Sequence, residues 1–355
     1  MIYQIGLLAG WPYAISENLR KRGFEAINIV LSSEDSGGIS DKQGKKVLSK
    51  RALKYDKALN DNKDSIIAKL FNRIKLVFGI IKNGQMVHYH SGTILPFCLD
   101  TYIFKFFKIP MFISWGGGDA RIIEMAVSDN PFFYRFDDKY KDRKIRSKLK
   151  TLAKNGVKVI TDPEMEIYCA PFFKNIYRFR QPIDIRMLDE YVKIEQKDKS
   201  DIVKILHMPT HPIPRGTIFV EDAINRLQKD GYKFEYKFIT NLTQHEVYQE
   251  IADCDILVDE LRTGSHGVLA LESCALYKPT ITYIKDSIID KFPKELPFVN
   301  TNPITIYDNL KFLILNPQVR EELGKKSRMY VEKYHEIDLV VDDLIKIYKE
   351  CGAKI

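Results

Sequence analysis

Residues 254–284 read CDILVDELRTGSHGVLALESCALYKPTITYI. Residues 255–258 are a short, mainly apolar run typical of a buried strand, and residues 268–276 have the length and composition of a helix. Residues 280–284 predict a second strand. A strand, a helix and a strand in this order indicate a βαβ unit, whose two strands lie parallel in one sheet.

The same alternation continues on both sides of this stretch. The other elements predicted in the second half are strands at 202–207 and 234–240 and helices at 219–229, 243–252, 316–334 and 337–351. Those predicted in the first half are strands at 2–8, 26–31, 86–90, 111–115 and 157–161 and helices at 12–22 and 95–107. The helix at 243–252 starts with Thr243 and Glu246, which are spaced as a capping box. Residues 33–63 are polar and lysine-rich, so we expect a mobile loop or insertion there.

Two halves that both alternate strands and helices predict an α/β protein with two Rossmann-like domains facing a cleft. We expect the first domain to cover residues 1–185 and the second to cover residues 186–335. The boundary falls after Pro182-Ile183-Asp184, in the charged stretch 191–201. The C-terminal helix of residues 336–355 is expected to pack back on the first domain.

The composition is that of a soluble globular chain, with 355 residues, 45% hydrophobic and 29% charged. Five cysteines without a Cys-x-x-Cys spacing exclude a typical disulfide framework or zinc ribbon and suit a reducing compartment. The chain has no run of 18 apolar residues, and its start does not resemble a signal peptide. We therefore expect a cytoplasmic protein.

The charge is distributed unevenly. Residues 1–185 contain 31 Lys and Arg against 19 Asp and Glu, within a chain whose net charge is +8. Such a bias indicates an anionic partner, such as a membrane surface or nucleic acid, or else a solvated basic face. Apolar residues recur at helical spacing over 66–81 among lysines and arginines, which predicts either an interfacial helix or a core-facing one. Residues 139–154 add eight basic residues.

Four segments contain candidate binding or catalytic residues. The loop 208–217 places Arg215 just before Gly216-Thr217 at a helix start, where free amides and the helix dipole favour a phosphate. The alternative is a solvated arginine. In the loop 259–268, Gly264 and Gly267 let the backbone approach a ligand, and the amides of Gly267 and Val268 would form an anion site.

The other candidates lie on the following helix and at two strand ends. Glu272 lies among apolar residues, where a carboxylate needs partners such as a ribose diol or a salt bridge. Asp119 follows three glycines at a strand end, so it either faces a ligand crevice or caps a helix. His88 and His90 share one strand face, and without further ligands nearby a pocket-lining His90 is favoured over a metal site.

These segments resemble the group 1 (family 4) glycosyltransferases of the two-domain GT-B fold. Residues 205–217 look like the family's "HxP…KGT" loop, with Arg215 in place of the lysine. Residues 254–279 look like "ADIVVDQL…GxxGxxAxEAMAxGKP", and residues 116–121 like "xGSDVR". Weaker likenesses lie at Thr161-Asp-Pro-Glu and Pro182-Ile-Asp184.

The resemblance implies roles for the matching positions. Arg215, Gly216 and Thr217 would bind the diphosphate of a nucleotide sugar, and Glu272 the ribose hydroxyls. Gly264, His266, Gly267 and Val268 would surround the phosphates or the donor sugar. Asp119, Arg215 and His90 would be the catalytic residues, and residues 240–243 would contact the base.

The chain departs from the family pattern at three positions. Gly264 stands where members often have the first of two glutamates, Gly116 where they often have a histidine, and Pro209 where they often have a second basic residue. His211 is the candidate substitute for that basic residue.

The resemblance implies transfer of a sugar from a nucleotide-diphosphate sugar, UDP- or GDP-linked, to a hydroxyl acceptor, with retention and without a metal or another cofactor. The first domain would bind the acceptor, a glycan or lipid-linked glycan of cell-surface polysaccharide assembly. Its basic half would meet an anionic inner membrane face, and no nucleic-acid partner is expected. The alternatives are a nucleotide-sugar 2-epimerase and a non-catalytic relative.

Overall fold

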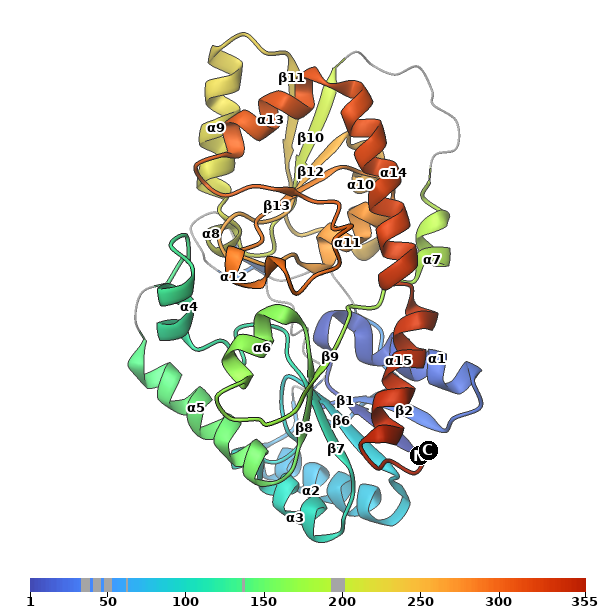
Figure 1. Cartoon of the computed structure of the whole chain (residues 1–355). Helices are drawn as coiled ribbons and strands as arrows, with labels where there is room; N and C mark the ends of the chain where they lie inside the picture. The colour runs from blue at the N-terminus through green and yellow to red at the C-terminus, as the bar shows by residue number, and fades with distance from the viewer. Residues whose placement is uncertain (33–38, 41–45, 48–52, 62, 136–137, 193–201) are drawn as a thin grey trace.

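The computed structural model describes residues 1–355 except 33–38, 41–45, 48–52, 62, 136–137 and 193–201. It contains two open parallel sheets in two domains stacked end to end (Figure 1). The α/β fold with two Rossmann-like domains, predicted from the alternation of strands and helices, is confirmed.

The first sheet has seven parallel strands. In spatial order they are β5 (Lys57–Ala58), β2 (Ala26–Val30), β1 (Ile2–Ile5), β6 (Met86–His90), β7 (Met111–Ser114), β8 (Lys158–Thr161) and β9 (Ile176–Arg178). The helices of this half are α1 (Trp11–Lys21), α2 (Ile66–Asn83), α3 (Leu99–Phe106), α4 (Ile123–Asp129), α5 (Lys139–Lys154) and α6 (Pro163–Cys169). Shorter elements are η1 (Leu8–Gly10), η2 (Pro96–Cys98) and the hairpin of β3 (Ile39–Ser40) and β4 (Lys46–Val47).

The second sheet has five parallel strands. In spatial order they are β11 (Phe234–Phe238), β10 (Val203–His207), β12 (Ile256–Val258), β13 (Thr280–Thr282) and β14 (Val299–Asn300). The remaining helices are α7 (Ile185–Asp189), α8 (Pro212–Arg215), α9 (Thr217–Lys229), α10 (Gln244–Asp253), α11 (Val268–Ala275), α12 (Asp286–Ile289), α13 (Ile306–Leu315), α14 (Pro317–Tyr334) and α15 (Ile337–Glu350).

Successive side chains along each strand point to opposite faces of the sheet, and helices bury both faces. On one face of the first sheet, Tyr3 and Val87 share a core with α2, α3 and α5, while Ile2 and Met86 on the other face pack with α1 and α15. In the second sheet, α9 and α13 cover one face and α10, α11 and α14 the other. Burial on both faces explains why the strands read as short apolar runs.

Three predicted elements differ from the structure. The helix expected at 95–107 is interrupted, because Phe97 and Cys98 both have positive φ angles and separate η2 from α3. The first strand ends at Ile5 rather than at residue 8, because Gly6 turns the chain with φ +124°. Within the segment 33–63, residues 57–58 form the edge strand β5 instead of a loop, and the predictions for 33–38, 41–45, 48–52 and 62 lie outside the described residues.

The chain crosses between the domains twice, at one place. The amide of Ile183 donates to the carbonyl of His335 at 2.8 Å, and the amide of Ile337 donates back to Ile183 at 3.0 Å. After the second crossing, α15 packs on the first domain, where the Tyr348 hydroxyl lies 2.6 Å from Nδ1 of His88. The charged stretch expected near the first crossing lies largely in residues 193–201, outside the described part of the chain.

Gly324 marks a close approach between α14 and the end of α11. A Cβ atom at Gly324 would lie 2.2 Å from the backbone oxygen of Tyr277, whereas a Cβ at Gly79, inside α2, would have nothing within 4 Å. Alanine favours a helix over glycine by about 1 kcal/mol at both sites. Gly324→Ala is nevertheless expected to destabilise the protein by about 1–3 kcal/mol through overpacking, while Gly79→Ala stabilises it.

Chemical denaturation of the two variants beside the wild type measures this difference. If Gly324→Ala raised the unfolding midpoint as much as Gly79→Ala, the close packing of α14 against Tyr277 would be wrong.

Candidate active site

A cavity of about 640 Å³ lies between the two domains. Its walls are loops at the carboxyl ends of the central strands of both sheets, which is where open α/β sheets bind ligands. The residues from the first domain include Leu8, Ser91, Gly116 to Asp119, Arg121, Asp162 and Glu164. Those from the second domain include Met208 to His211, Arg215, Ile239 to Leu242, Asp259, Glu260 and Ser265 to Leu269.

Arg215 is held by two carboxylates that follow β12. Its Nη1 lies 3.1 Å from Oδ1 of Asp259 and 2.5 Å from Oε2 of Glu260. Both acidic side chains are almost fully buried, whereas that of Arg215 is 24% exposed and lines the cavity. The guanidinium is therefore held at the cavity wall by two acidic side chains that line the same cavity.

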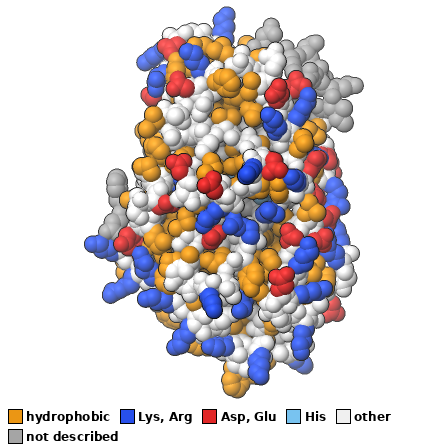
Figure 2. Space-filling model, in the orientation of Figure 1, with side chains coloured by type: hydrophobic (Ala, Val, Ile, Leu, Met, Phe, Trp, Pro, Cys, Tyr) orange, Lys and Arg blue, Asp and Glu red, His pale blue; other side chains and the backbone are white. Residues whose placement is uncertain are grey.

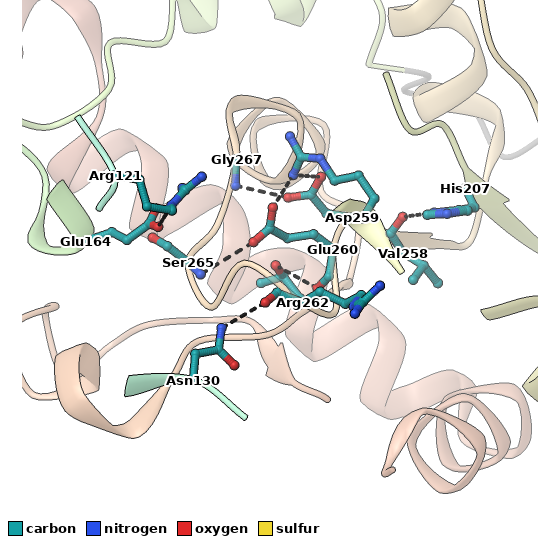
Figure 3. Close-up of polar contacts among 12 residues, drawn as sticks. Arg121, Asn130, Glu164, His207, Val258, Asp259, Glu260, Arg262, Ser265 and Gly267 are labelled. Atoms are coloured by element: carbon teal, nitrogen blue, oxygen red, sulfur yellow. Dashed lines mark hydrogen bonds and ion pairs between the residues drawn. The ribbon is translucent and has the colours of Figure 1, made fainter. Parts of the chain in front are cut away.

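The loop between β12 and α11 orients the same two carboxylates with its backbone. The Gly267 amide donates to Oδ2 of Asp259 at 3.0 Å, and the Ser265 amide lies 3.4 Å from Oε1 of Glu260 (Figure 3). A side chain at Gly267 would begin 3.0 Å from Nη1 of Arg215. The glycine thus lets the guanidinium approach the loop, and its amide binds a protein carboxylate instead of pointing free into the cavity as the sequence suggested.

Burial changes the protonation of Glu260. It raises the pKa of this carboxyl to about 8, an effect that Arg215 opposes and Asp259 increases. Near neutral pH the two carboxyls beside Arg215 therefore carry less than two negative charges in total.

A second buried ion pair lines the cavity from the first domain. Oε1 of Glu164 accepts from Nε and Nη2 of Arg121 at 2.8 and 2.6 Å, and both side chains are about nine-tenths buried. Asp162, two residues before Glu164, accepts from the Met165 amide at the start of α6. Its pKa is raised to about 6, first by burial and then by the charge of Glu164. Each domain thus presents an arginine paired with carboxylate to the same cavity.

Asp119 lies on the cavity wall in a loop built from glycines. Its Oδ1 accepts from the Gly117 amide at 2.9 Å and lies 3.3 Å from the Gly116 amide, so it closes its own loop instead of capping a helix. Lys148 of α5 also contacts this loop, because its Nζ donates to the backbone oxygen of Asp119 at 3.2 Å. Of the eight basic residues of α5, Lys148 is therefore directed inward.

A second tie joins the domains beside the cavity. Nζ of Lys285, a side chain only 2% exposed, lies 2.7 Å from Oδ2 of Asp129 at the end of α4. The Asn130 side chain donates to the backbone oxygen of Arg262 at 2.8 Å, and Nε of Arg262 donates to the backbone oxygen of Phe132 at 3.0 Å. We call residues 129–132, 262 and 285 the interdomain clasp.

No protein-family model matches the chain, and no curated protein matches its sequence. Solved structures match its fold. A glycosyltransferase from Rickettsia africae ESF-5 is 14% identical with a TM-score of 0.66, and sucrose-phosphate synthase from Thermosynechococcus elongatus is 10% identical with a TM-score of 0.64; each match covers 100% of this chain and 99% of that chain. Anabaena HepE, solved in complex with UDP-glucose, is 10% identical with a TM-score of 0.63 over 98% of this chain and 99% of that chain.

These matches span both sheets and the cleft between them. The chain has the GT-B fold. The cavity lies between the two Rossmann-like domains of this fold.

Several of the predicted site residues line the cavity of this GT-B chain together. They are Asp119, Arg215, His266, Gly267 and Val268, joined by His211 and by residues 240–242 of the loop expected to contact a base. His266 is buried among Phe292, Phe298 and His335, and burial lowers its pKa to about 4. It is therefore a neutral wall residue at physiological pH.

Four other predicted residues lie outside the cavity lining. His90 is buried in the sheet, where its Nε2 donates to Gln4 at 2.7 Å. Glu272 is buried one turn into α11, where it accepts from Gln244 and from the Tyr248 hydroxyl, both at 3.1 Å. Gly216 and Thr217 form the start of α9 behind Arg215, and the Thr217 hydroxyl is bonded to His207.

The last predicted residue, Gly264, lies at the interdomain clasp. It has φ +85°, and a Cβ there would lie about 3 Å from Asn130 and Lys285. The clasp thus occupies the space in which the glutamate of the family pattern would begin.

The sequence reasoning missed the carboxylates around the two arginines. Asp259 and Glu260 come directly after a predicted strand, so their position at a carboxyl strand end was a signal of ligand proximity. Asp162 and Glu164 have the same relation to β8. Their ion pairs with Arg215 and Arg121 join residues 43 to 45 positions apart. Contacts over such a separation leave no spacing pattern in the sequence, so they could not be predicted from it.

None of the helices in the described part of the chain combines the length and apolar character needed to cross a bilayer. Among the same residues, no three His, Cys, Asp or Glu side chains are grouped to hold a metal ion.

Proposed function

We propose that this protein is a glycosyltransferase that moves a sugar from a nucleotide-diphosphate sugar to a hydroxyl acceptor. The observation that carries the proposal is the cavity between the domains, lined by Arg215 and Arg121. Its volume of about 640 Å³ lies in the range of small-molecule sites. The neighbour HepE was solved with UDP-glucose on the same fold, which supports this class of donor.

The proposed chemistry is stabilisation of the leaving group. Breaking the bond between sugar and diphosphate leaves negative charge on the phosphate oxygens, and a guanidinium fixed in advance beside that charge lowers the barrier. Arg215 is fixed in this way by Asp259 and Glu260. We propose retention of configuration without a metal, and a glycan or lipid-linked glycan as the acceptor.

The roles proposed for single residues follow their positions. Asp119 lies on the cavity wall from the first domain, so it is proposed to orient a hydroxyl of donor or acceptor. If the reaction inverts configuration, Asp119 and Asp162 are the candidate bases, because both line the cavity. His90 is placed behind the wall and is proposed only to support it.

A thermal-shift series with UDP, GDP, ADP, CMP and TDP, each with and without EDTA, tests the proposal. A ligand at 100 times its Kd adds about 2.7 kcal/mol to the stability of the folded state. We expect one diphosphate to raise the melting temperature equally with and without EDTA, and the matching nucleotide sugar to turn over only with an acceptor. Absence of any shift would favour a non-catalytic relative, and product formed without an acceptor would favour an epimerase.

Nucleotide binding is expected to weaken as the pH rises through about 8. Below this pH Glu260 is largely protonated, and above it the ionised carboxylate adds a negative charge beside Arg215 that repels a diphosphate. The ligand phosphates are already ionised in this range, because their last pKa is about 6. We expect about a tenfold loss of affinity between about pH 7 and pH 9, measured by titration calorimetry.

The matched variant is Glu260→Gln, which keeps the shape of the side chain and cannot ionise. Its affinity should stay constant over the same range. A wild-type affinity that did not change, or a loss in Glu260→Gln equal to that of the wild type, would show that another group governs binding; His266, with a pKa of about 4, does not titrate there.

A further inference from the structure

Helix α2 has two apolar stripes, and only one of them faces the core. Val77 and Ile80 are buried against the first sheet, with Leu76 and Ile81 partly buried beside them. The second stripe consists of exposed residues at spacings of four, three and four, namely Ile67, Phe71, Ile74 and Phe78. Ile67 is 81% exposed, Phe71 65% and Phe78 67%. Residues 66–81 therefore form one helix with a core-facing side and an exposed apolar side, which are the two features that the sequence offered as alternatives.

The neighbouring helix continues this apolar surface. Helices α2, α3 and α5 all cover the same face of the first sheet, because Val77, Phe104 and Leu149 belong to one core. Around α3, the side chains of Phe97, Leu99, Tyr102, Phe106 and Phe107 are exposed, Phe97 and Phe106 by at least 80%. Figure 1 places α2 and α3 at the end of the first domain that is remote from the second domain.

The charge on the outside of these helices has one sign. Helix α2 contains Lys69, Arg73, Lys75 and Lys82 and no acidic residue, and α5 contains seven basic residues besides the inward-directed Lys148. The two acidic residues of the three helices, Asp100 and Asp142, are buried. Asp100 accepts from the amides of Ile94 and Leu95, and Asp142 from those of Ile123 and Glu124.

The result is an exposed apolar surface bordered by cations. Figure 2 shows Lys and Arg side chains crowded over the first domain, with hydrophobic groups between them. A second copy of the chain would bring the same positive charges together, so the charge disfavours self-association through this face. An anionic lipid surface satisfies both features, because it attracts the cations and accepts aromatic and aliphatic side chains at headgroup depth.

We propose that the outer faces of α2 and α3 insert into the interface of an anionic bilayer, with α5 contributing basic residues beside them. We call this the lipid-facing surface. It stands independently of the proposed function, because no residue of the lipid-facing surface lines the cavity. Bound in this way, the chain would be a peripheral protein that lies on one leaflet.

Vesicle co-sedimentation of the full chain tests the proposal. Vesicles of phosphatidylcholine alone and of equal parts phosphatidylcholine and phosphatidylglycerol are the two probes. We expect binding to the mixed vesicles only, weakened by added salt. Phe71→Ser/Phe78→Ser should lower this binding by at least about tenfold, since each phenylalanine loses its apolar contact with lipid. Lys75→Glu/Lys82→Glu should remove the preference for phosphatidylglycerol.

The matched control is Ile218→Ser/Phe312→Ser, which removes two exposed apolar residues from α9 and α13 of the second domain. This variant should bind vesicles like the wild type. All the side chains replaced in the three variants are exposed, so the folds should be retained and the melting temperatures should confirm it.

Three results would overturn the proposal. They are equal vesicle binding by wild type and Phe71→Ser/Phe78→Ser, binding that does not respond to salt, and a dimer in light scattering that the same variant dissociates. Nucleotide-induced thermal shifts should be unchanged in Phe71→Ser/Phe78→Ser. A failure of lipid binding with intact nucleotide binding therefore leaves the proposed function standing, and the reverse result leaves the lipid-facing surface standing.

Discussion

Arg215→Ala is expected to lower sugar-transfer turnover by about 100- to 1,000-fold, the usual loss when a fixed donor to a developing negative charge is removed. The guanidinium lines the cavity, and its two carboxylate contacts both use Nη1. An arginine has five N–H donors, so the ion pairs leave donors for phosphate oxygens. Turnover of the donor sugar under saturating acceptor measures the effect.

Arg215→Ala also leaves the Asp259 carboxylate buried without its cation, which can cost about 3–5 kcal/mol of stability. The double variant Arg215→Ala/Asp259→Asn removes this charge. Arg215→Lys keeps the positive charge but lacks the planar, forked donors of the guanidinium. We expect the double variant to recover stability but not turnover, and the lysine variant to retain intermediate turnover. A folded Arg215→Ala protein with wild-type turnover would contradict the assigned role.

The second large effect concerns the interdomain clasp. Asp129→Ala removes the partner of the Lys285 ammonium, whose side chain is 2% exposed. A buried charge that loses its partner typically costs about 3–5 kcal/mol, or the domains separate until water reaches the lysine. We therefore expect a lower unfolding midpoint together with a larger radius of gyration in small-angle scattering.

Lys285→Met is the matched control, because methionine keeps much of the buried volume and has no charge. Replacing a buried ion pair with apolar groups is often neutral for stability. Lys285→Met and Asp129→Ala/Lys285→Met should thus both be more stable than Asp129→Ala. If the single aspartate variant matched the double variant, the ion pair would not be buried in solution.

Much of the fold could be predicted because neighbouring residues determine where many of its helices and strands begin and end. The spacing of Thr243 and Glu246 predicts the start of α10, and the structure contains both hydrogen bonds of the capping box. The apolar runs that became β10 and β12 were visible because strands buried on both faces have few polar residues. The break between η2 and α3 was not visible, because Phe97 and Cys98 are ordinary residues whose positive φ angles are imposed by tertiary packing.

The candidate site was only partly predictable for the same reason. Asp119 and Gly267 lie in glycine-containing loops, Arg215 ends the short helix α8 just before α9, and all three line the cavity. The use of Gly267 was not foreseen: its amide binds Asp259, and its missing side chain admits Arg215. Such roles depend on contacts between segments, which a single sequence does not encode by spacing.

The return of α15 to the first domain has a consequence for synthesis on the ribosome. Tyr348 and Leu344 complete the core that also contains Ile2 and Phe112, so the first domain needs the last helix to bury one face of its sheet. At about 5–20 residues per second, the ribosome spends on the order of 10–30 s between the end of β9 and the end of α15. During that interval the second domain can fold first, although it is encoded later, while the nascent first sheet still exposes the apolar face that α15 will cover.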